Sequence, residues 1–265
     1  MTKPTILLSN DDGISSPGIL AAAEALMPLG RVVVAAPLTQ QTSMGRAYTG
    51  NRDARFEPYD LAVSGGKIEA YSLDASPAAI VRHAFLAMPG LSPDIVVAGI
   101  NYGENIGYNV SGSGTVGAAL EGASRGVPSL AMSLETAIES QYTFSEQNWT
   151  ASKYFTRFFA DILLRKGMAP GVDVLKVEVP AGATSETPWR MTRLSPFTYY
   201  EACIDPQSMN SRRGDAVFTK RSGENEPQDT DAYVIRTAKE VAVTPLSLDF
   251  TAAVSLHVVS DWVAE

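Results

Sequence analysis

The sequence predicts an α/β fold with a mostly parallel sheet, and two strand–turn–helix units carry this prediction. In the first unit, the β-compatible residues 5–9 run into an acidic turn, and a helix follows from Pro17 to about residue 29. In the second, residues 93–98 form a buried type of strand that opens into a glycine-rich loop and then into a helix that starts near Val116. Units of this kind build parallel sheets with helices on both faces.

The rest of the chain continues this alternation. We expect strands at 31–36, 68–73, 127–133 and 172–177, and helices from Pro77 to about 87 and over 149–166. The first and second helices start at Ser16-Pro17 and Ser76-Pro77, where a capping serine precedes a proline at the first helical position.

The character of the chain changes after about residue 195. Residues 205–229 are polar and turn-rich, which on their own favour a flexible surface loop, and the run around His257 looks like a strand. We therefore expect a core domain over 1–195 and a C-terminal extension with returning strands over 196–265.

The acidic turn after the first strand is the first candidate site. Asp11 and Asp12 stand side by side, before Gly13, at the carboxyl edge of the predicted sheet. Two adjacent carboxylates resist burial together unless one takes up a proton or both share a cation. A hard divalent ion is the expected solution, whereas a solvated turn with Gly13 at positive φ is the plain alternative.

The glycine-rich loop after residue 98 is the second candidate site. It ends in Ser113, Gly114 and Thr115, which we place at a helix N-terminus, where free N–H groups and the helix dipole favour an anion such as phosphate. Asn101, just past the strand, offers an amide oxygen to the same cation as the aspartates. The loop lacks the Gly-Lys-Ser/Thr ending of an ATP-binding P-loop, which argues against energy-coupled nucleotide hydrolysis.

The composition excludes several other classes of function. A formal net charge of −8 and an isoelectric point near 4.9 argue against a duplex nucleic-acid binder. The single cysteine, Cys203, allows no intrachain disulfide and no thiolate zinc site. We see neither an apolar signal segment nor eighteen consecutive apolar residues, so we expect a cytoplasmic protein without membrane contact. Neither His83 nor His257 lies near a motif, which gives Ser-His-Asp catalysis little support.

Four motifs in a fixed order resemble the SurE (survival protein E) family of metal-dependent nucleotidases. They are Ser-Asn-Asp-Asp-Gly at the first strand, Ala-Pro before a polar loop at 38–45, Gly-Ile-Asn-x-Gly-x-Asn-Ile-Gly from Gly99, and Ser-Gly-Thr-Val-Gly-Ala-Ala from Ser113. Later stretches at 176–180, 191–194, 230–231 and 243–246 resemble further blocks of that family. The resemblance covers nearly the whole chain.

The resemblance implies a Rossmann-like core and the hydrolysis of nucleoside monophosphates to nucleoside and phosphate with one divalent ion per subunit, Mg²⁺ or Mn²⁺. In the family the ion is held by the two aspartates, by a serine of the second loop and by the asparagine of Gly-Ile-Asn. These positions correspond to Asp11, Asp12, Thr42 and Asn101.

The chain departs from the family at three places. The family usually has Gln-Ser-Gly where this chain has Gln41-Thr42-Ser43, so that Ser43 is an alternative ligand to Thr42. Arg46 and Ala47 replace a usual His-Ser, and Gly112 stands where a tyrosine usually precedes Ser-Gly-Thr. These changes lie around the expected pocket.

The reaction that we expect is attack of an activated water on phosphorus in line with the leaving group. Asn105, Ser113, Gly114 and Thr115 would hold the phosphate oxygens, and Asp11 or Asp12 would carry the proton. The family resemblance further implies that residues 205–229 form an extended arm exchanged between subunits of a homodimer or homotetramer.

Two alternatives belong to different classes. Receiver domains also place an acidic pair after the first strand, and Asp74 would be their phosphoacceptor, but the lysine that they need near Met132-Ser133 is missing. The other alternative is a catalytically impaired protein of the same fold that binds a nucleotide or another anion.

Overall fold

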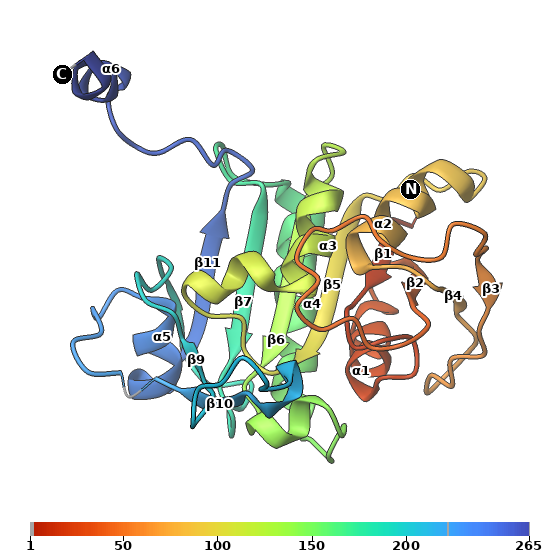
Figure 1. Cartoon of the computed structure of the whole chain (residues 1–265). Helices are drawn as coiled ribbons and strands as arrows, with labels where there is room; N and C mark the ends of the chain where they lie inside the picture. Colours follow the sequence, from red (N-terminus) through yellow and green to blue (C-terminus); the bar gives the residue numbers. More distant parts are fainter. Residues whose placement is uncertain (1–2, 222, 265) are drawn as a thin grey trace.

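The computed structural model describes residues 3–221 and 223–264, and a single large sheet forms its centre (Figure 1). The strand order of this nine-stranded sheet is β3-β4-β2-β1-β5-β6-β7-β11-β8. Its parallel part consists of β4 (Glu69–Leu73), β2 (Arg31–Pro37), β1 (Thr5–Ser9), β5 (Ile95–Tyr102), β6 (Ser129–Leu134) and β7 (Val174–Val179). The predicted α/β class with a mostly parallel sheet is confirmed.

The two ends of the sheet are not parallel to its middle. At one edge the two-residue β3 (Glu57–Pro58) pairs antiparallel with β4, inside the segment that the sequence left irregular. At the other, β11 (Val241–Leu246) runs antiparallel to β7, and β8 (Trp189–Met191) runs parallel to β11. The returning strand of the C-terminal extension therefore joins the main sheet.

Helices cover both faces of the sheet, because alternate residues of each strand point to opposite sides. On one face Ile6 and Leu8 pack with α1 (Pro17–Leu26) and α4 (Thr150–Lys166). On the other, Leu7 and Val96 pack with α2 (Pro77–Ala87) and α3 (Gly114–Ala123). The parallel strands are buried on both faces, which explains their nearly continuous apolar sequences.

The order of the strands places a switch point between β1 and β5. From β1 the chain crosses through α1 to β2 on one side, and it returns from β4 through α2 to β5 on the other side of β1. Since α1 after β1 and α3 after β5 lie on opposite faces, the loops that leave β1 and β5 diverge, and ligands of open α/β sheets bind in the crevice that results. Asp11 and Asp12 follow β1, and Asn101 lies near the end of β5.

Beyond residue 195 a hairpin and short helices precede the returning strand. The hairpin pairs β9 (Tyr200–Cys203) with β10 (Val217–Lys220), and η3 (Arg213–Asp215) lies between them. After it come α5 (Asp231–Tyr233) and the single-turn η4 (Val234–Ala238), and then β11. In Figure 1 the chain ends in α6 (Leu256–Ala264), which stands away from the body on an extended segment.

Two local predictions are wrong. The strand predicted to end at Ala98 continues to Tyr102, because after an irregularity it pairs again with β6 at Asn101 and Ser133. The run around His257 is helix α6 and not a strand, since Leu256, Val259 and Val263 recur at helical spacing. Among the described residues we find no helix both long and apolar enough to span a membrane.

Candidate active site

The turn after β1 is held by a buried asparagine. Asn10 donates from Nδ2 to the carbonyl oxygen of Gly13 at 3.0 Å and to Oγ of Ser16 at 2.8 Å. The same Ser16 oxygen accepts the backbone N–H of Ile19 and so caps α1, with Pro17 at the first helical position. Asn10 thereby ties the turn to the start of the helix, which fixes the two aspartates between them.

Asp11 and Asp12 are both buried, with exposed fractions of 5% and 3%. Asp11 accepts the hydroxyl of Thr115 at Oδ1 over 2.6 Å. Asp12 accepts the backbone N–H of Tyr102 at Oδ2 over 3.0 Å, and Nε2 of Gln40 lies 3.3 Å from its Oδ1. In the described part of the chain neither carboxylate forms an ion pair with a lysine, arginine or histidine.

Burial without a counter-ion changes the acidity of this pair. Burial raises the pKa of Asp11, although the Thr115 hydroxyl opposes the change. Burial raises the pKa of Asp12 well above its ordinary value, and the charge of Asp11 adds to the effect. In both carboxyl groups burial therefore favours neutralisation of the charge, which a proton or a bound cation can supply.

The end of β5 contributes an amide beside the acidic pair. Asn101 donates from Nδ2 to the carbonyl oxygens of Tyr102 at 3.3 Å and Gly103 at 2.7 Å. These two bonds fix the orientation of the amide and leave its oxygen available to a cation. Asn101 lines the same pocket as Asp11 and Asp12, as the sequence predicts.

The N-terminus of α3 lies directly against Asp11. Ser113 is its N-cap and accepts the N–H of Val116 at Oγ over 3.1 Å. Any Cβ at Gly114 would lie 2.7 Å from Cβ and 2.8 Å from Oδ2 of Asp11, so only glycine permits this approach. Ser113 lines the pocket, whereas Thr115 is fully buried and its hydroxyl is committed to Asp11. The predicted anion-binding residues are thus brought together with the acidic pair.

The loop after β2 completes this side of the pocket. Thr42 and Ser43 both line it and are exposed, so the structure brings both alternative ligands to the site. The loop is anchored by the N–H of Gly45 on the carbonyl oxygen of Gly112 and by Arg46, whose guanidinium lies 2.8 Å from the buried Glu121 on α3. One departure from the family pattern, Arg46, therefore holds this loop through its side chain, whereas Gly112 contributes only a backbone carbonyl oxygen.

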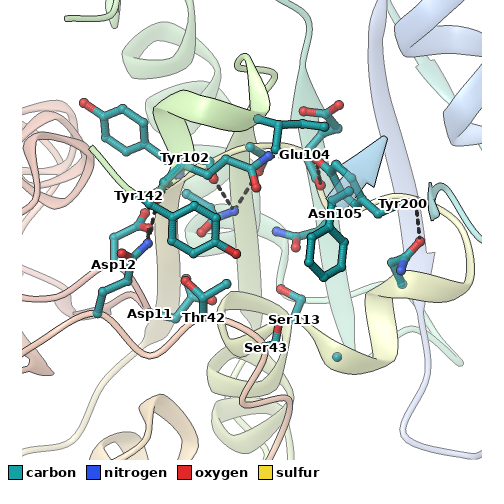
Figure 2. Close-up of a pocket in the computed structure, with 18 residues that line it drawn as sticks. Asp11, Asp12, Thr42, Ser43, Tyr102, Glu104, Asn105, Ser113, Tyr142 and Tyr200 are labelled. Carbon is teal, nitrogen blue, oxygen red and sulfur yellow. Dashed lines mark hydrogen bonds between the residues drawn. The ribbon is translucent and has the colours of Figure 1, made fainter. Parts of the chain in front are cut away.

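The opposite wall comes from three segments that are distant in sequence (Figure 2). Glu104 and Asn105 follow β5, Tyr142 follows η2 (Ile138–Gln141), and Tyr200 and Phe218 come from the β9–β10 hairpin. Figure 2 shows Asp11, Asp12 and Thr42 on one side, Glu104, Asn105 and Tyr200 on the other, and the ring of Tyr142 projecting across the front. Apart from Asn105, the sequence analysis identified none of these residues. Tyr142 and Phe218 carried no signal in the sequence other than being aromatic in polar segments.

The donor set fits a hard divalent cation. In residues 3–221 and 223–264 no three His, Cys, Asp or Glu side chains form a metal-binding group. What converges here is two carboxylates, the oxygen of Asn101 and the hydroxyls of Thr42 and Ser43. Oxygen donors of this kind suit Mg²⁺ or Mn²⁺ rather than zinc or copper. Because the two buried carboxyl groups have no counter-ion among the described residues, the chemistry of the site fits the ion.

Comparisons with known proteins give one consistent result. The family model described as Survival protein SurE matches residues 6–201. A protein named 5'-nucleotidase SurE from Thermococcus kodakarensis is 39% identical over 261 residues, with 95% of each chain covered. One of the same name from Methanocella arvoryzae is 35% identical over 255 residues, with 93% of each chain covered. A crystal structure of the SurE protein from Aquifex aeolicus superposes with a TM-score of 0.74 at 29% identity, covering 99% of this chain and 100% of that one.

Proposed function

The chain belongs to the SurE family, and from this premise we propose that it is a 5'-nucleotidase, which hydrolyses nucleoside monophosphates to nucleoside and phosphate. The observation that carries the proposal is the pair of buried carboxylates, Asp11 and Asp12, which lie at the switch point of the sheet and against the N-terminus of α3. Activity on the 3'-phosphate belongs to the same proposal.

We assign one divalent ion per subunit, Mg²⁺ or Mn²⁺, to Asp11, Asp12, Asn101 and Thr42, with Ser43 as the alternative to Thr42. When bound, such an ion supplies Lewis-acid polarisation of the phosphoryl group and activation of water. The hydrogen bonds from Tyr102 N–H and the Thr115 hydroxyl hold the two carboxylates in place. The protein thereby prepares the metal site before the ion arrives.

The remaining residues bind the phosphate and move the proton. We assign the phosphate oxygens to Asn105 and Ser113, and to Gly114 and Thr115 at the N-terminus of α3, where the helix dipole favours negative charge. Water attacks phosphorus on the side opposite the ester oxygen, and Asp11 or Asp12 carries the proton from the water to the leaving oxygen. The nucleoside leaves with that proton.

Aromatic side chains at the mouth of the pocket support a nucleoside as the leaving group. Tyr142 and Phe218 line the pocket and are 61% and 50% exposed, so their faces are open to a nucleobase. We expect Tyr142→Ala to raise KM for adenosine monophosphate severalfold and to leave KM for ribose 5-phosphate unchanged. An equal rise for both substrates would contradict a base contact at Tyr142.

We further propose that residues 1–195 form the catalytic core, and that 196–265, besides adding Tyr200 and Phe218 to the pocket wall, mediate assembly into a homodimer or homotetramer. No described residue of α6 is buried within the chain, and Leu256, Trp262 and Val263 are at least 70% exposed. An apolar helix of this kind is typical of a surface that a second copy covers. Light scattering of the Trp262→Glu variant tests the proposal, because a mass equal to that of the wild-type protein would exclude α6 from the interface.

A further inference from the structure

Strand β7 carries two charged side chains that are completely buried, behind the pocket wall. Lys176 and Glu178 both have side-chain exposures of 0%, and the Lys176 ammonium lies 3.3 Å from Oε1 of Glu178 and 3.0 Å from Oδ2 of the equally buried Asp231. Burying such charges costs more free energy than packing apolar residues of similar volume. A role other than packing therefore has to explain them.

Both charged side chains form hydrogen bonds to the backbone of one pocket residue, Asn105. The Lys176 ammonium donates to the carbonyl oxygen of Asn105 at 2.8 Å, and the N–H of Asn105 donates to Oε2 of Glu178 at 3.0 Å. The side-chain amide of Asn105 also donates to Oγ of Ser133 at 2.9 Å, and that hydroxyl lies 3.4 Å from Oε1 of Glu178. Ser133 takes one of the two amide hydrogens, which leaves the other free to meet a ligand.

Neighbouring residues of the same loop are tied down as firmly. The N–H of Gly107 donates to Oδ2 of Asp231 at 3.2 Å. The buried Glu104 accepts the hydroxyl of Tyr199 at 2.7 Å and the ammonium of Lys220 at 2.5 Å. Residues 104–107 are therefore held by charged groups on both sides of Asn105, so that the backbone has little freedom there.

We propose that Lys176 and Glu178 are positioning residues for catalysis: they clamp the backbone of Asn105 so that its side-chain amide meets the phosphoryl group. This inference rests on the proposed function, in which Asn105 binds phosphate. Neither Lys176 nor Glu178 touches the substrate, because both lie behind the pocket wall with no exposed surface.

The Glu178→Gln variant tests this role with little risk to folding. Glutamine has the shape of glutamate but one acceptor oxygen, so it cannot serve the Asn105 N–H and the Lys176 ammonium as the carboxylate does. Lys176 keeps Asp231 as its counter-ion. We expect kcat/KM for adenosine monophosphate to fall about tenfold, because a small misplacement of a binding group is costly in catalysis.

A double-mutant cycle with Asn105→Ala shows whether the effect passes through Asn105. The alanine variant keeps the backbone bonds and removes only the amide, so Glu178→Gln should lower kcat/KM in the wild-type background and have no further effect in the Asn105→Ala background. Effects that multiply would overturn the inference, as would a Glu178→Gln variant with unchanged kcat/KM beside an impaired Asn105→Ala. Unchanged kcat/KM in Asn105→Ala would instead refute the phosphate contact of the proposed function, and the inference with it.

The dependence on pH separates positioning from a general loss of structure. Burial raises the pKa of Glu178 to about 7, against the effect of Lys176, while Asp231 on α5 and Glu104 after β5 add to the rise. Near pH 6 wild-type Glu178 is mostly protonated and has lost one acceptor oxygen, so it resembles the glutamine of the variant. The ratio of wild-type to variant kcat/KM should therefore be larger near pH 8.5 than near pH 6. A ratio that is the same at both pH values would contradict the clamp. Glu24→Gln on α1, which removes a carboxylate bonded to Lys153 at 2.6 Å outside the pocket, is the matched control and should leave kcat/KM unchanged.

Discussion

Replacing Asp12 by asparagine should stabilise the metal-free protein while it abolishes turnover. Asp12 is 3% exposed and adjacent in sequence to the equally buried Asp11. Since its pKa is raised by burial and by Asp11, the folded state prefers the protonated form, and wild-type stability is lost as the pH rises above the ordinary pKa of an aspartate. Asparagine keeps the shape of the side chain and removes this charge.

The size of the effect follows from two opposing contributions. Two unit charges about 5 Å apart repel each other by about 3 kcal/mol at an effective dielectric constant of about 20. A second contribution opposes this one. The N–H of Tyr102 donates to Oδ2 of Asp12 at 3.0 Å, and in Asp12→Asn it would donate to a neutral acceptor instead of a charged one, at a cost of about 1 kcal/mol. Asp12→Asn should therefore be about 2 kcal/mol more stable than the wild-type protein in EDTA, or about 4 °C in melting temperature.

Metal ions should reverse this order. An ion at about one hundred times its dissociation constant stabilises the wild-type protein by about 2.7 kcal/mol, and the asparagine variant should lose most of that gain. Thermal unfolding at pH 8, in EDTA and with Mn²⁺, measures both effects. A metal-free variant that melts below the metal-free wild type, or an equal metal response in both, would refute the reasoning. The surface variant Asp161→Asn is the matched control and should change neither quantity by more than about 0.5 kcal/mol.

Three further substitutions test other parts of the account. Gly114→Ala should lower kcat/KM at least tenfold, because its Cβ would lie 2.8 Å from Oδ2 of Asp11; wild-type kinetics would show that α3 does not need this close approach. Glu121→Gln should destabilise the protein by about 2 kcal/mol in urea unfolding at pH 7. Burial raises the pKa of Glu121, but hydrogen bonds from Tyr48 and Arg46 lower it overall, so the stability that the carboxylate contributes is present above pH 4.5 and is lost as the pH falls below that value. A difference between variant and wild type that persists at pH 3 would contradict the assignment. For Glu178 the sign is opposite, because its pKa is about 7 in the folded protein against an ordinary value of 4.5, so wild-type stability is lost as the pH rises from 4.5 to 7. The free energy of unfolding of Glu178→Gln should therefore rise by about 3 kcal/mol relative to the wild type across that pH range. A difference that stays constant with pH would argue against a buried titrating carboxyl group.

Those parts of the fold that are encoded locally could be predicted from the sequence. The cap at Ser16 and the proline after it give the start of α1, and the apolar runs of β1 and β5 give two neighbouring buried strands. Because the carboxyl ends of parallel strands share one edge of a sheet, the meeting of Asp11 and Asn101 followed from the same patterns.

Features that depend on distant partners could not be predicted in this way. The strand β5 extends to Tyr102 only because β6 offers it a partner beyond the irregularity. In β7, Lys176 and Glu178 alternate with apolar residues like the solvent face of an edge strand, yet Asn105 and Asp231 bury them. The pocket wall formed by Tyr142 and Phe218 depends on loops whose course no local pattern determines.

The most direct test of the central claim is phosphate release from the wild-type protein. The purified chain would be given adenosine, guanosine, cytidine and uridine monophosphates and p-nitrophenyl phosphate, in EDTA and with Mg²⁺ or Mn²⁺. The account predicts release that requires the metal ion, favours the nucleotides and is absent in Asp12→Asn. No release with either metal, from protein shown to be folded, would contradict it and would identify the chain as an anion-binding protein that keeps the fold of the family without its catalysis.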